Sequence, residues 1–491
     1  MAATGDLQQP IDHLAHDSRE VGPGGCFFAL RGAAADGHLF IDKAVQHGAT
    51  AVVCESPPRT ALPGGVALVT VTDTRAALAA AAAVFFDHPS EHLRLVGVTG
   101  TNGKTTTAFV LHHLLSALGE AAGLIGTIEV RIGERTVEAT HTTPDALALN
   151  GLLCEMVDAG CTACAMEVSS HALVQQRVRG QRFAAAVFTN LTHDHLDYHG
   201  SVEAYRDAKA SLFAMLDAGA VAIVNQDDAA WEAMVKGSAA RVVTYGASGP
   251  DAPGHGRAAD IPFEIVANEP DGLRLRLGGE TRKFRLAGDF NAYNLAAAYA
   301  VGTELGFESA AVLDALQTAP PVPGRLETLR ADDGTVAVVD YAHTPDALDN
   351  VLATVREMLP AGAALTCVFG CGGDRDRAKR PLMGRIAERR ADRVVLTNDN
   401  PRTEDPERIL AEIAAGLDDP GAATVLPDRA AAIRRAVADA APGDVIVVAG
   451  KGHETYQITG TERAHFDDRE AVREAFAARS LGRAGTHPST S

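Results

Sequence analysis

The sequence lacks any apolar run of the ~18 residues that a membrane-spanning helix needs, and residues 1–7 are not a basic segment followed by an apolar stretch. We therefore expect a protein that stays in the cytoplasm. Positive charge is also in short supply, since 44 basic residues face 63 acidic ones and the formal net charge is -19. A large negative field repels phosphate polymers and anionic lipid, so we expect neither nucleic acid nor a membrane as a partner.

Cysteine is equally scarce. The seven cysteines are an odd number spread over 491 residues, which is not the pattern of a disulfide framework. Cys161 and Cys164 have the spacing of metal ligands, but no matching second pair follows them. Cys367 and Cys371 also lack the spacing of a zinc ribbon. We expect all seven to be small, buried side chains.

The length is that of about three domains, and apolar runs alternate with helical patterns throughout. The expected strands are 26–30, 51–54 and 66–71, then 93–98, 162–168, 184–190 and 221–225, then 336–340, 365–369, 393–397 and 445–449. We predict an α/β protein with a small α/β domain over 1–88, a central P-loop-type domain with a mostly parallel sheet over 89–322, and a Rossmann-like domain over 323–491. Prolines in 320–324 mark the second boundary. Residues 482–491 are small and polar and are expected to be frayed.

The most informative segment is 99–107, which reads T-G-T-N-G-K-T-T-T directly after the apolar run 93–98. This order predicts a strand, a phosphate-binding loop and a helix. The loop glycines allow a tight turn that aims backbone N–H groups at phosphate oxygens, Lys104 adds charge, and Thr105 offers a hydroxyl to Mg²⁺. Val98 stands where the common P-loop pattern has glycine. The alternative is a glycine turn with an incidental lysine, and the flanking strand and helix disfavour it.

Two further strand ends carry metal-binding groups. Glu167 ends one apolar strand, and 190–199 follows the next with three histidines and two aspartates. Both segments are expected at the same sheet edge as the phosphate loop, where a carboxylate and a histidine can hold Mg²⁺ beside ATP. Histidine is an unusual ligand for Mg²⁺, so zinc is the alternative, but a phosphate loop already demands Mg²⁺. Lys209 lies in the helical pattern 205–213 and from its neighbours alone is a solvated helix lysine.

The third domain presents three more loops at strand ends. Residues 371–380 contain four cations, 399–402 read D-N-P-R, and 450–454 read G-K-G-H-E. The first of them has the composition of an anion site. Because parallel strands end at one edge, the three loops are expected to converge on one layer with groups that grip carboxylates and amines.

Together these motifs resemble the Mur ligase family, ATP-dependent amide ligases that build the peptide stem of the bacterial cell wall. The resemblance covers nearly the whole chain and rests on 17–19, 36–37, 99–105, 142–144, 167–171, 190–199, Lys209, 288–291 with Asn294, 324–327 and 340–343. The D-N-P-R segment 399–402 is similar to the motif of members that add meso-diaminopimelate rather than lysine.

The resemblance implies ATP-dependent addition of meso-2,6-diaminopimelate to the D-glutamate carboxylate of UDP-N-acetylmuramoyl-L-alanyl-D-glutamate through an acyl phosphate. It also implies a monomeric, Mg²⁺-dependent enzyme of peptidoglycan precursor synthesis, and hence of cell shape, cell division and the cell cycle.

The resemblance further assigns roles to individual residues. The catalytic residues would be Lys104, Glu167, His195 and Lys209. Those that bind ATP would be Gly100, Thr101, Asn102, Gly103, Lys104, Thr105, Thr106, Asn291, Asn294, Arg325 and Asp340. The nucleotide-linked peptide would contact Ser18, Thr142, Thr143, Ser169, Gln175 and Arg177, and the amino acid would contact Arg375, Asp399, Asn400, Pro401, Arg402, Gly450 and Glu454. Thr105 and Glu167 would serve one Mg²⁺, and His195 and a carbamylated Lys209 would serve a second.

Two other functions fit part of the pattern. Folylpolyglutamate synthases share the loop and the amide-forming chemistry, but they lack the first domain and the D-N-P-R segment as it stands here. A non-catalytic regulatory protein would use ATP only as a switch. Glu167, His195 and the cationic third domain argue against it, because a switch needs no site for an amino acid.

Overall fold

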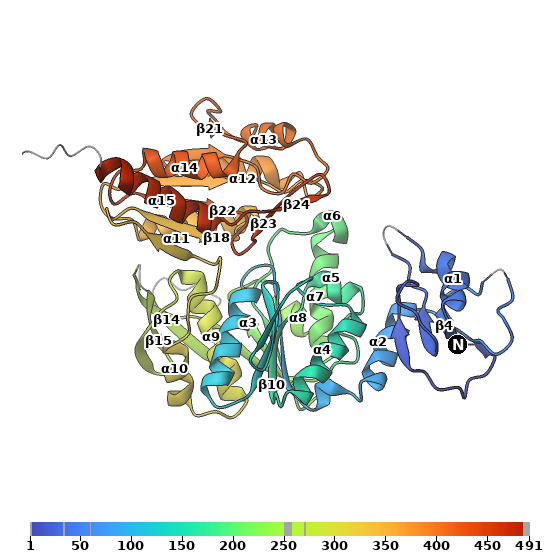
Figure 1. Cartoon of the computed structure of the whole chain (residues 1–491). Helices are drawn as coiled ribbons and strands as arrows, with labels where there is room; N and C mark the ends of the chain where they lie inside the picture. Colours follow the sequence, from blue (N-terminus) through green and yellow to red (C-terminus); the bar gives the residue numbers. More distant parts are fainter. Residues whose placement is uncertain (1, 33–34, 59, 250–257, 270–271, 485–491) are drawn as a thin grey trace, which may run out of the picture.

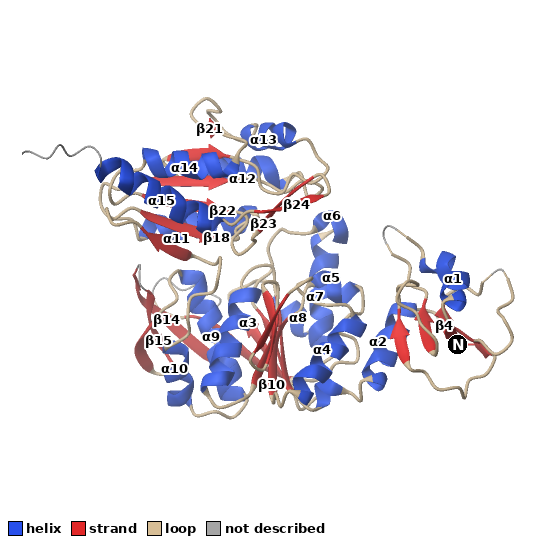
Figure 2. Cartoon of the chain, in the orientation of Figure 1, coloured by secondary structure: helices blue, strands red, loops and turns tan. Residues whose placement is uncertain are grey.

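The computed structural model describes residues 2–32, 35–58, 60–249, 258–269 and 272–484. It is an α/β protein, as predicted, with three separate large sheets and helices packed on them (Figure 1, Figure 2). Figure 1 shows the first unit, in blue, at one side of the central unit and the third unit, in orange and red, above it. The boundaries at 88/89 and 322/323 stay predictions. Among the described residues, no helix combines the length and the apolar character that crossing a membrane requires.

The first unit is a five-stranded sheet in the order β1-β5-β4-β3-β2. Its strands are β1 (Ala2–Thr4), β2 (His13–Ala15), β3 (Gly25–Phe28), β4 (Ala49–Cys54) and β5 (Ala67–Thr70). Its helices are η1 (Gly37–Phe40), α1 (Ile41–Gln46) and α2 (Thr74–Phe85). Asp73 caps α2 by accepting a hydrogen bond from the backbone N–H of Ala76, the usual way to satisfy an orphan donor in the first turn.

The central sheet has the order β16-β15-β14-β13-β12-β11-β6-β10-β7-β8-β9. The strands are β6 (Arg94–Thr99), β7 (Ala122–Ile125), β8 (Glu129–Ile132), β9 (Arg135–Glu138), β10 (Ala163–Glu167), β11 (Ala185–Phe188), β12 (Val221–Asn225), β13 (Arg241–Ala247), β14 (Ile261–Glu269), β15 (Gly272–Leu277) and β16 (Glu280–Phe284). From β14 to β7 all neighbours run parallel, which confirms the prediction. Antiparallel strands, which were not predicted, extend both edges.

Helices cover both faces of this sheet. They are η2 (Pro89–Glu91), α3 (Lys104–Ala117), α4 (Ala146–Asp158), α5 (Ser170–Val174), α6 (Leu196–His199), α7 (Val202–Ala214), α8 (Trp231–Val235), α9 (Asp289–Glu304) and α10 (Ser309–Gln317). Side chains alternate along β6: Val96 and Val98 pack with α3, α9 and α10, whereas Leu95 packs with α4 and α7. The strand that leads into the phosphate loop is therefore buried on both faces of the sheet.

The third unit is a six-stranded sheet in the order β17-β18-β22-β19-β20-β21, with a separate hairpin β23-β24. Its strands are β17 (Glu327–Arg330), β18 (Val336–Asp340), β19 (Leu365–Phe369), β20 (Arg393–Leu396), β21 (Thr424–Val425), β22 (Val445–Ala449), β23 (Tyr456–Thr459) and β24 (Glu462–His465). The helices are α11 (Pro345–Glu357), α12 (Lys379–Arg390), α13 (Pro406–Ala414), α14 (Arg429–Asp439) and α15 (Asp468–Ala484). One apolar cluster joins the sheet to α11, α12 and α13, and another joins it to α14 and α15.

Two expectations need correction. Helix α15 continues to Ala484, so residues 482–484 are helical rather than frayed, and 485–491 lie outside the described residues. All seven cysteines are free, but Cys154 is half-buried on α4, so the prediction that every cysteine is buried is wrong for this one. Its helix turns that position away from the apolar stripe of Leu149, Leu153 and Met156.

Candidate active site

The phosphate-loop motif forms the predicted strand, loop and helix in the middle of the central sheet. β6 lies between β10 and β11, and helix α3 begins at Lys104. Gly103 has a φ of 83°, and a Cβ there would lie 2.6 Å from Asn294 Oδ1. A side chain at this position would therefore meet both a backbone conformation that L residues avoid and a neighbouring amide. The loop needs glycine here for its shape.

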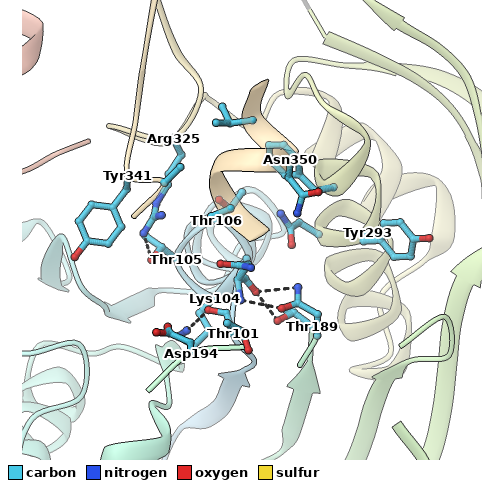
Figure 3. Close-up of a pocket in the computed structure, with 18 of the residues that line it drawn as sticks. Thr101, Lys104, Thr105, Thr106, Thr189, Asp194, Tyr293, Arg325, Tyr341 and Asn350 are labelled. Carbon is cyan, nitrogen blue, oxygen red and sulfur yellow. Dashed lines mark hydrogen bonds between the residues drawn. The ribbon is translucent and has the colours of Figure 1, made fainter. Parts of the chain in front are cut away.

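Lys104 folds back over this loop (Figure 3). Its Nζ donates to the carbonyl oxygens of Gly100 and Thr101, both at 2.8 Å. Burial lowers the pKa of Lys104, and the carboxylates of Glu167 and Asp194 oppose that effect. The ammonium thus lies at the N-terminus of α3, where backbone N–H groups also favour an anion.

Glu167 lies at the end of β10, fully buried beside the loop. Its Oε2 accepts hydrogen bonds from Thr105 Oγ1 at 3.0 Å and Thr127 Oγ1 at 3.1 Å, and its Oε1 accepts from the Thr127 N–H at 2.7 Å. A hydroxyl beside a carboxylate is an oxygen donor pair that suits Mg²⁺, which takes its remaining ligands from phosphates and water. Thr127 follows the unpredicted strand β7, so nothing in the sequence analysis pointed to it.

The histidine-rich segment lies across the loop from Glu167. His195 has a left-handed backbone with φ 52°, and Asp194 Oδ1 accepts its N–H at 2.9 Å. Burial lowers the pKa of His195 to about 4 although Asp194 opposes the shift, so the ring is neutral near pH 7 and has a free electron pair for a ligand. No group of three or more His, Cys, Asp or Glu side chains among the described residues is arranged to hold a metal ion, so 193–199 do not form the cluster that zinc requires.

Lys209 is buried, although its sequence neighbours alone predicted a solvated helix lysine. Its side chain on α7 is only 1% exposed, and its Nζ donates to the Gly100 carbonyl at 2.7 Å. It also lies 4.4 Å from the ring centre of Tyr205, which is buried with it. Burial and the nearby Lys104 lower the pKa of Lys209 well below its usual value. Solvation was the wrong expectation because this face of α7 packs behind the phosphate loop.

Residues from the third unit complete the pocket above the loop. Arg325 Nη2 donates to Thr105 Oγ1 at 3.0 Å, and its guanidinium lies 4.5 Å from the ring centre of Tyr341 (Figure 3). Asp340 Oδ2 accepts the N–H of Leu326 at 2.7 Å, which fixes the chain beside Arg325. The resulting pocket has a volume of about 570 Å³ and is lined from both units.

Most of the residues expected around ATP meet in this pocket. Those that line it are Thr101, Asn102, Gly103, Lys104, Thr105, Thr106, Glu167, His195, Lys209, Asn294, Arg325 and Asp340, together with Thr142 and Ser169 from the expected substrate set. Gly100 and Asn291 do not line the pocket but contact residues that do. The Gly100 carbonyl accepts hydrogen bonds from Lys104 and Lys209, and Asn291 Oδ1 accepts one from Asn294 Nδ2 at 2.9 Å. Asp194, Tyr205, Tyr341 and His343 also line the pocket; they lie in the segments 190–199, 205–213 and 340–343, but no individual role was expected for them.

A second pocket of about 650 Å³ lies between the first unit and the central unit. Ser18, Gln175 and Arg177 line it, as expected for one ligand that contacts all three. Arg177 Nη1 donates to the Thr143 carbonyl at 2.7 Å, and Thr143 Oγ1 donates to the Glu167 carbonyl at 2.8 Å. Hydrogen bonds to and from Thr143 therefore connect Arg177 in the second pocket with the backbone of Glu167, whose carboxylate lies beside the phosphate loop.

The third-unit loops 399–402 and 450–454 meet as predicted. Asn400 Nδ2 donates to Glu454 Oε2 at 2.8 Å, and a Cβ on Gly450 would lie 2.7 Å from Asp399 Oδ2. Pro401 is buried within this turn. Arg402 follows with a φ of 51°, and its Nη1 donates to the Gly373 carbonyl at 2.9 Å.

The cationic segment 371–380 is only partly the anion site that its composition suggested. Arg380 is fully buried and donates to Glu404 at 2.9 Å and to Glu412 at 2.6 Å, and Arg377 also pairs with Glu412. Both charges are neutralised by helix α13 and its preceding loop, which the sequence pattern could not show. Arg375 is exposed and lies beside Arg402.

The central unit and the third unit are in contact close to the pocket over the phosphate loop. Asn102 of the phosphate loop donates from Nδ2 to Asp346 Oδ2 of the third unit at 2.7 Å. Within the third unit, the ring of Tyr341, which lines the pocket, lies 5.0 Å from that of His453. His453 adjoins Glu454, so the loops of the third unit lie next to the pocket over the phosphate loop. The glycine-rich loop, the hydroxyl–carboxylate pair of Thr105 and Glu167 and the cluster of Asn400 and Glu454 thus lie in neighbouring parts of the structure.

Comparison with known proteins identifies the family. The chain matches the Mur ligase middle domain over 98–302, the glutamate ligase domain of Mur ligases over 324–452 and the catalytic domain of the Mur ligase family over 10–89. The chain belongs to the Mur ligase family and is therefore a ligase.

Individual relatives cover almost the full length. A UDP-N-acetylmuramoyl-L-alanyl-D-glutamate--2,6-diaminopimelate ligase of Cytophaga hutchinsonii is 45% identical over 477 residues, 96% of each chain. The protein of the same name from Thermosynechococcus vestitus is 46% identical and covers 96% of this chain and 94% of its own. A solved structure of a ligase with this name aligns with a TM-score of 0.66 at 35% identity over 96% of both chains.

Proposed function

We propose that this protein is an ATP-dependent ligase that joins meso-2,6-diaminopimelate to the D-glutamate carboxylate of UDP-N-acetylmuramoyl-L-alanyl-D-glutamate. The observation that carries the proposal is the contact of Asn400 with Glu454 beside Asp399 and Arg402, next to a phosphate-loop pocket. This cluster offers both a cation for a carboxylate and carboxylates for an ammonium, which a free amino acid needs. The names of the relatives support the same substrates. A cytoplasmic location and a monomeric state stay predictions.

The chemistry follows from the poor reactivity of a carboxylate toward amines. The glutamyl carboxylate attacks the γ-phosphorus of ATP, the bond to the bridging oxygen breaks, and ADP leaves with an acyl phosphate formed. The amine then adds to the acyl carbon, loses a proton, and expels inorganic phosphate through a tetrahedral intermediate. Lys104 and Arg325 would neutralise charge on the moving phosphoryl group, the main electrostatic contribution to this kind of transfer.

Mg²⁺ fits the oxygen ligands of this site. Thr105 and Glu167 would hold one ion, and bound Mg²⁺ would supply charge neutralisation at the phosphates. His195 and Lys209 would hold a second, provided that Lys209 carries a carbamate, because an ammonium has no electron pair to donate. The buried, deprotonation-prone amine of Lys209 supports that modification.

The two alternative functions are less well supported. A folylpolyglutamate synthase has no need of the second pocket, to which Ser18 and Arg177 contribute from different units. A nucleotide switch has no need of the cluster around Asn400 and Glu454.

The deciding experiment is phosphate release from ATP. Release should require both the UDP-linked dipeptide and meso-diaminopimelate, and should be tested in parallel with lysine, ornithine and glutamate. Phosphate release in the absence of the UDP-linked dipeptide would contradict the proposal. Phosphate release that depends on glutamate and a folate would also contradict it.

Arg402 is expected to read the second carboxylate of meso-diaminopimelate, which lysine lacks. Nη1 is engaged by Gly373, and the remaining guanidinium N–H groups can form the paired hydrogen bonds that a carboxylate accepts. Lysine would leave this charge without its anion, a loss on the order of 2–5 kcal/mol and hence a preference of ~30-fold or more. We expect Arg402→Ala to lose most of the parent's preference in kcat/KM. An unchanged ratio in this variant would place specificity elsewhere in the third unit.

A further inference from the structure

Lys451 is a buried cation inside the loop 450–454 that sequence analysis passed over. Its side chain is fully buried, which is rare for lysine unless it is paired. Nζ donates to Asn400 Oδ1 at 3.1 Å and to Glu454 Oε2 at 3.0 Å, and it lies 5.4 Å from the ring centre of Tyr456. One ammonium thus contacts two residues of the cluster that we assign to the amino acid.

The contacts fix the orientation of the Asn400 side chain. Its Oδ1 accepts hydrogen bonds from Lys451 Nζ and from the backbone N–H of Ile458 at 2.9 Å. Two donors on one atom identify that atom as the oxygen, so Nδ2 must face Glu454, where it donates at 2.8 Å. With Lys451 in place, the amide has a single satisfied orientation.

The same ammonium orients Glu454. Within the described residues, the hydrogen bonds to this carboxylate from Lys451 and Asn400 both fall on Oε2, so acceptor capacity is left on Oε1. The side chain of Glu454 is 14% exposed, whereas that of Lys451 is 0% exposed. The carboxylate can therefore meet a ligand while its cation stays behind it.

We infer that Lys451 is a positioning residue for the amino-acid site. Its ammonium holds the Glu454 carboxylate and the Asn400 amide in the one arrangement that receives the ammonium group of the incoming amino acid. Lys451 itself does not touch the substrate. The inference rests on the proposed function and deepens it, because it assigns affinity for the amino acid to a residue behind the binding surface.

The test is Lys451→Met, which keeps an unbranched side chain of similar volume and removes its charge and donors. The KM for meso-diaminopimelate is expected to rise about 30-fold or more, the scale of removing one partner of a buried, hydrogen-bonded charge pair. The KM values for ATP and for the UDP-linked dipeptide should change less than about twofold, because those sites lie on other elements. Lys236→Met is the matched control, since Lys236 is exposed on the central unit.

A double-mutant cycle separates positioning from simple support of the fold. Glu454→Gln alone should raise the same KM, and adding Lys451→Met to it should raise the KM by less than about threefold, because the lysine acts through that carboxylate. A merely structural lysine would instead lower the thermal midpoint and kcat while leaving this KM unchanged. If the factors by which Glu454→Gln and Lys451→Met raise the KM for meso-diaminopimelate simply multiply in the double variant, the inference is overturned.

Lys451→Gln provides a second variant if the methionine variant does not unfold cooperatively. It keeps one donor and is expected to show a smaller rise in the same KM. A folded Met or Gln variant with the parent's KM for meso-diaminopimelate overturns the inference. If the parent itself releases no phosphate with meso-diaminopimelate, the proposed function fails instead, so the two failures are distinguishable.

Discussion

Lys209→Ala is expected to be almost inactive, with turnover at least ~1,000-fold below that of the parent, the upper range for removal of a preorganised charged group. The amine lies behind the phosphate loop, where its Nζ contacts the Gly100 carbonyl at 2.7 Å. Truncation removes both this contact and the group that is proposed to bear a carbamate. The loop and the second metal position would be affected together.

The physical reason for the carbamate is the environment of the amine. Burial and the neighbouring Lys104 lower the pKa of Lys209 well below its usual value, so a neutral amine with a free electron pair is favoured. Such an amine adds to the carbon of CO₂ and loses a proton, which leaves an anionic carbamate. The change replaces a cation that a metal would repel with oxygen ligands that Mg²⁺ prefers.

The measurement is phosphate release by Lys209→Ala with and without added short-chain carboxylates. Acetate or propionate should restore part of the activity by supplying an oxygen ligand in the space left by the side chain. Lys236→Ala is the control, because Lys236 is exposed at the C-terminal end of α8 and is not among the residues that line the pocket. Fully occupied density for an unmodified ammonium with nucleotide and Mg²⁺ bound would refute the carbamate.

The parts of this site that could be predicted are those with a local signal. The apolar run of β6, followed by glycines and then by Lys104, predicts a phosphate loop. Glu167 is recognisable because it ends the apolar run of β10. Parallel strands end at one edge, so these groups had to meet once the alternation was recognised. The same reasoning placed 399–402 and 450–454 side by side.

The parts that could not be predicted depend on partners far away in the chain. The segment 371–380 had the composition of an anion site, but the charge of its Arg380 is paired with the carboxylates of Glu404 and Glu412. Lys209 looked solvated because nothing in its own helix reveals the loop that covers it. Lys451 was one residue from a predicted ligand, yet its role comes from its contact with Asn400.

The edges of the central sheet escaped prediction for a different reason. β8 and β9 are strands of four residues with polar positions, and β9 is exposed throughout. Such strands lack the continuous apolar run that marks a strand buried on both faces. Thr127, which binds Glu167, lies just before this edge hairpin, so missing the hairpin also meant missing the residue.

Lys104→Ala is expected to lower turnover by about 100-fold or more, equivalent to roughly 3 kcal/mol of transition-state stabilisation. Its ammonium lies over the loop at 2.8 Å from two carbonyl oxygens, within the pocket that α3 opens toward. Negative charge moves from the γ-phosphate to the bridging oxygen as ADP leaves. A fixed cation at this point stabilises that charge more than it stabilises bound ATP.

The comparison variant for this prediction is Lys104→Arg, which keeps the charge but carries it on a planar fork that the tight loop does not match. It should recover only part of the turnover, which would show that position matters as well as charge. Both variants should change the affinity for the UDP-linked dipeptide much less than turnover, because Ser18, Gln175 and Arg177 line a separate pocket. Near-normal turnover in Lys104→Ala would remove this lysine from the mechanism and leave Arg325 and bound Mg²⁺ to neutralise the transferred phosphoryl group.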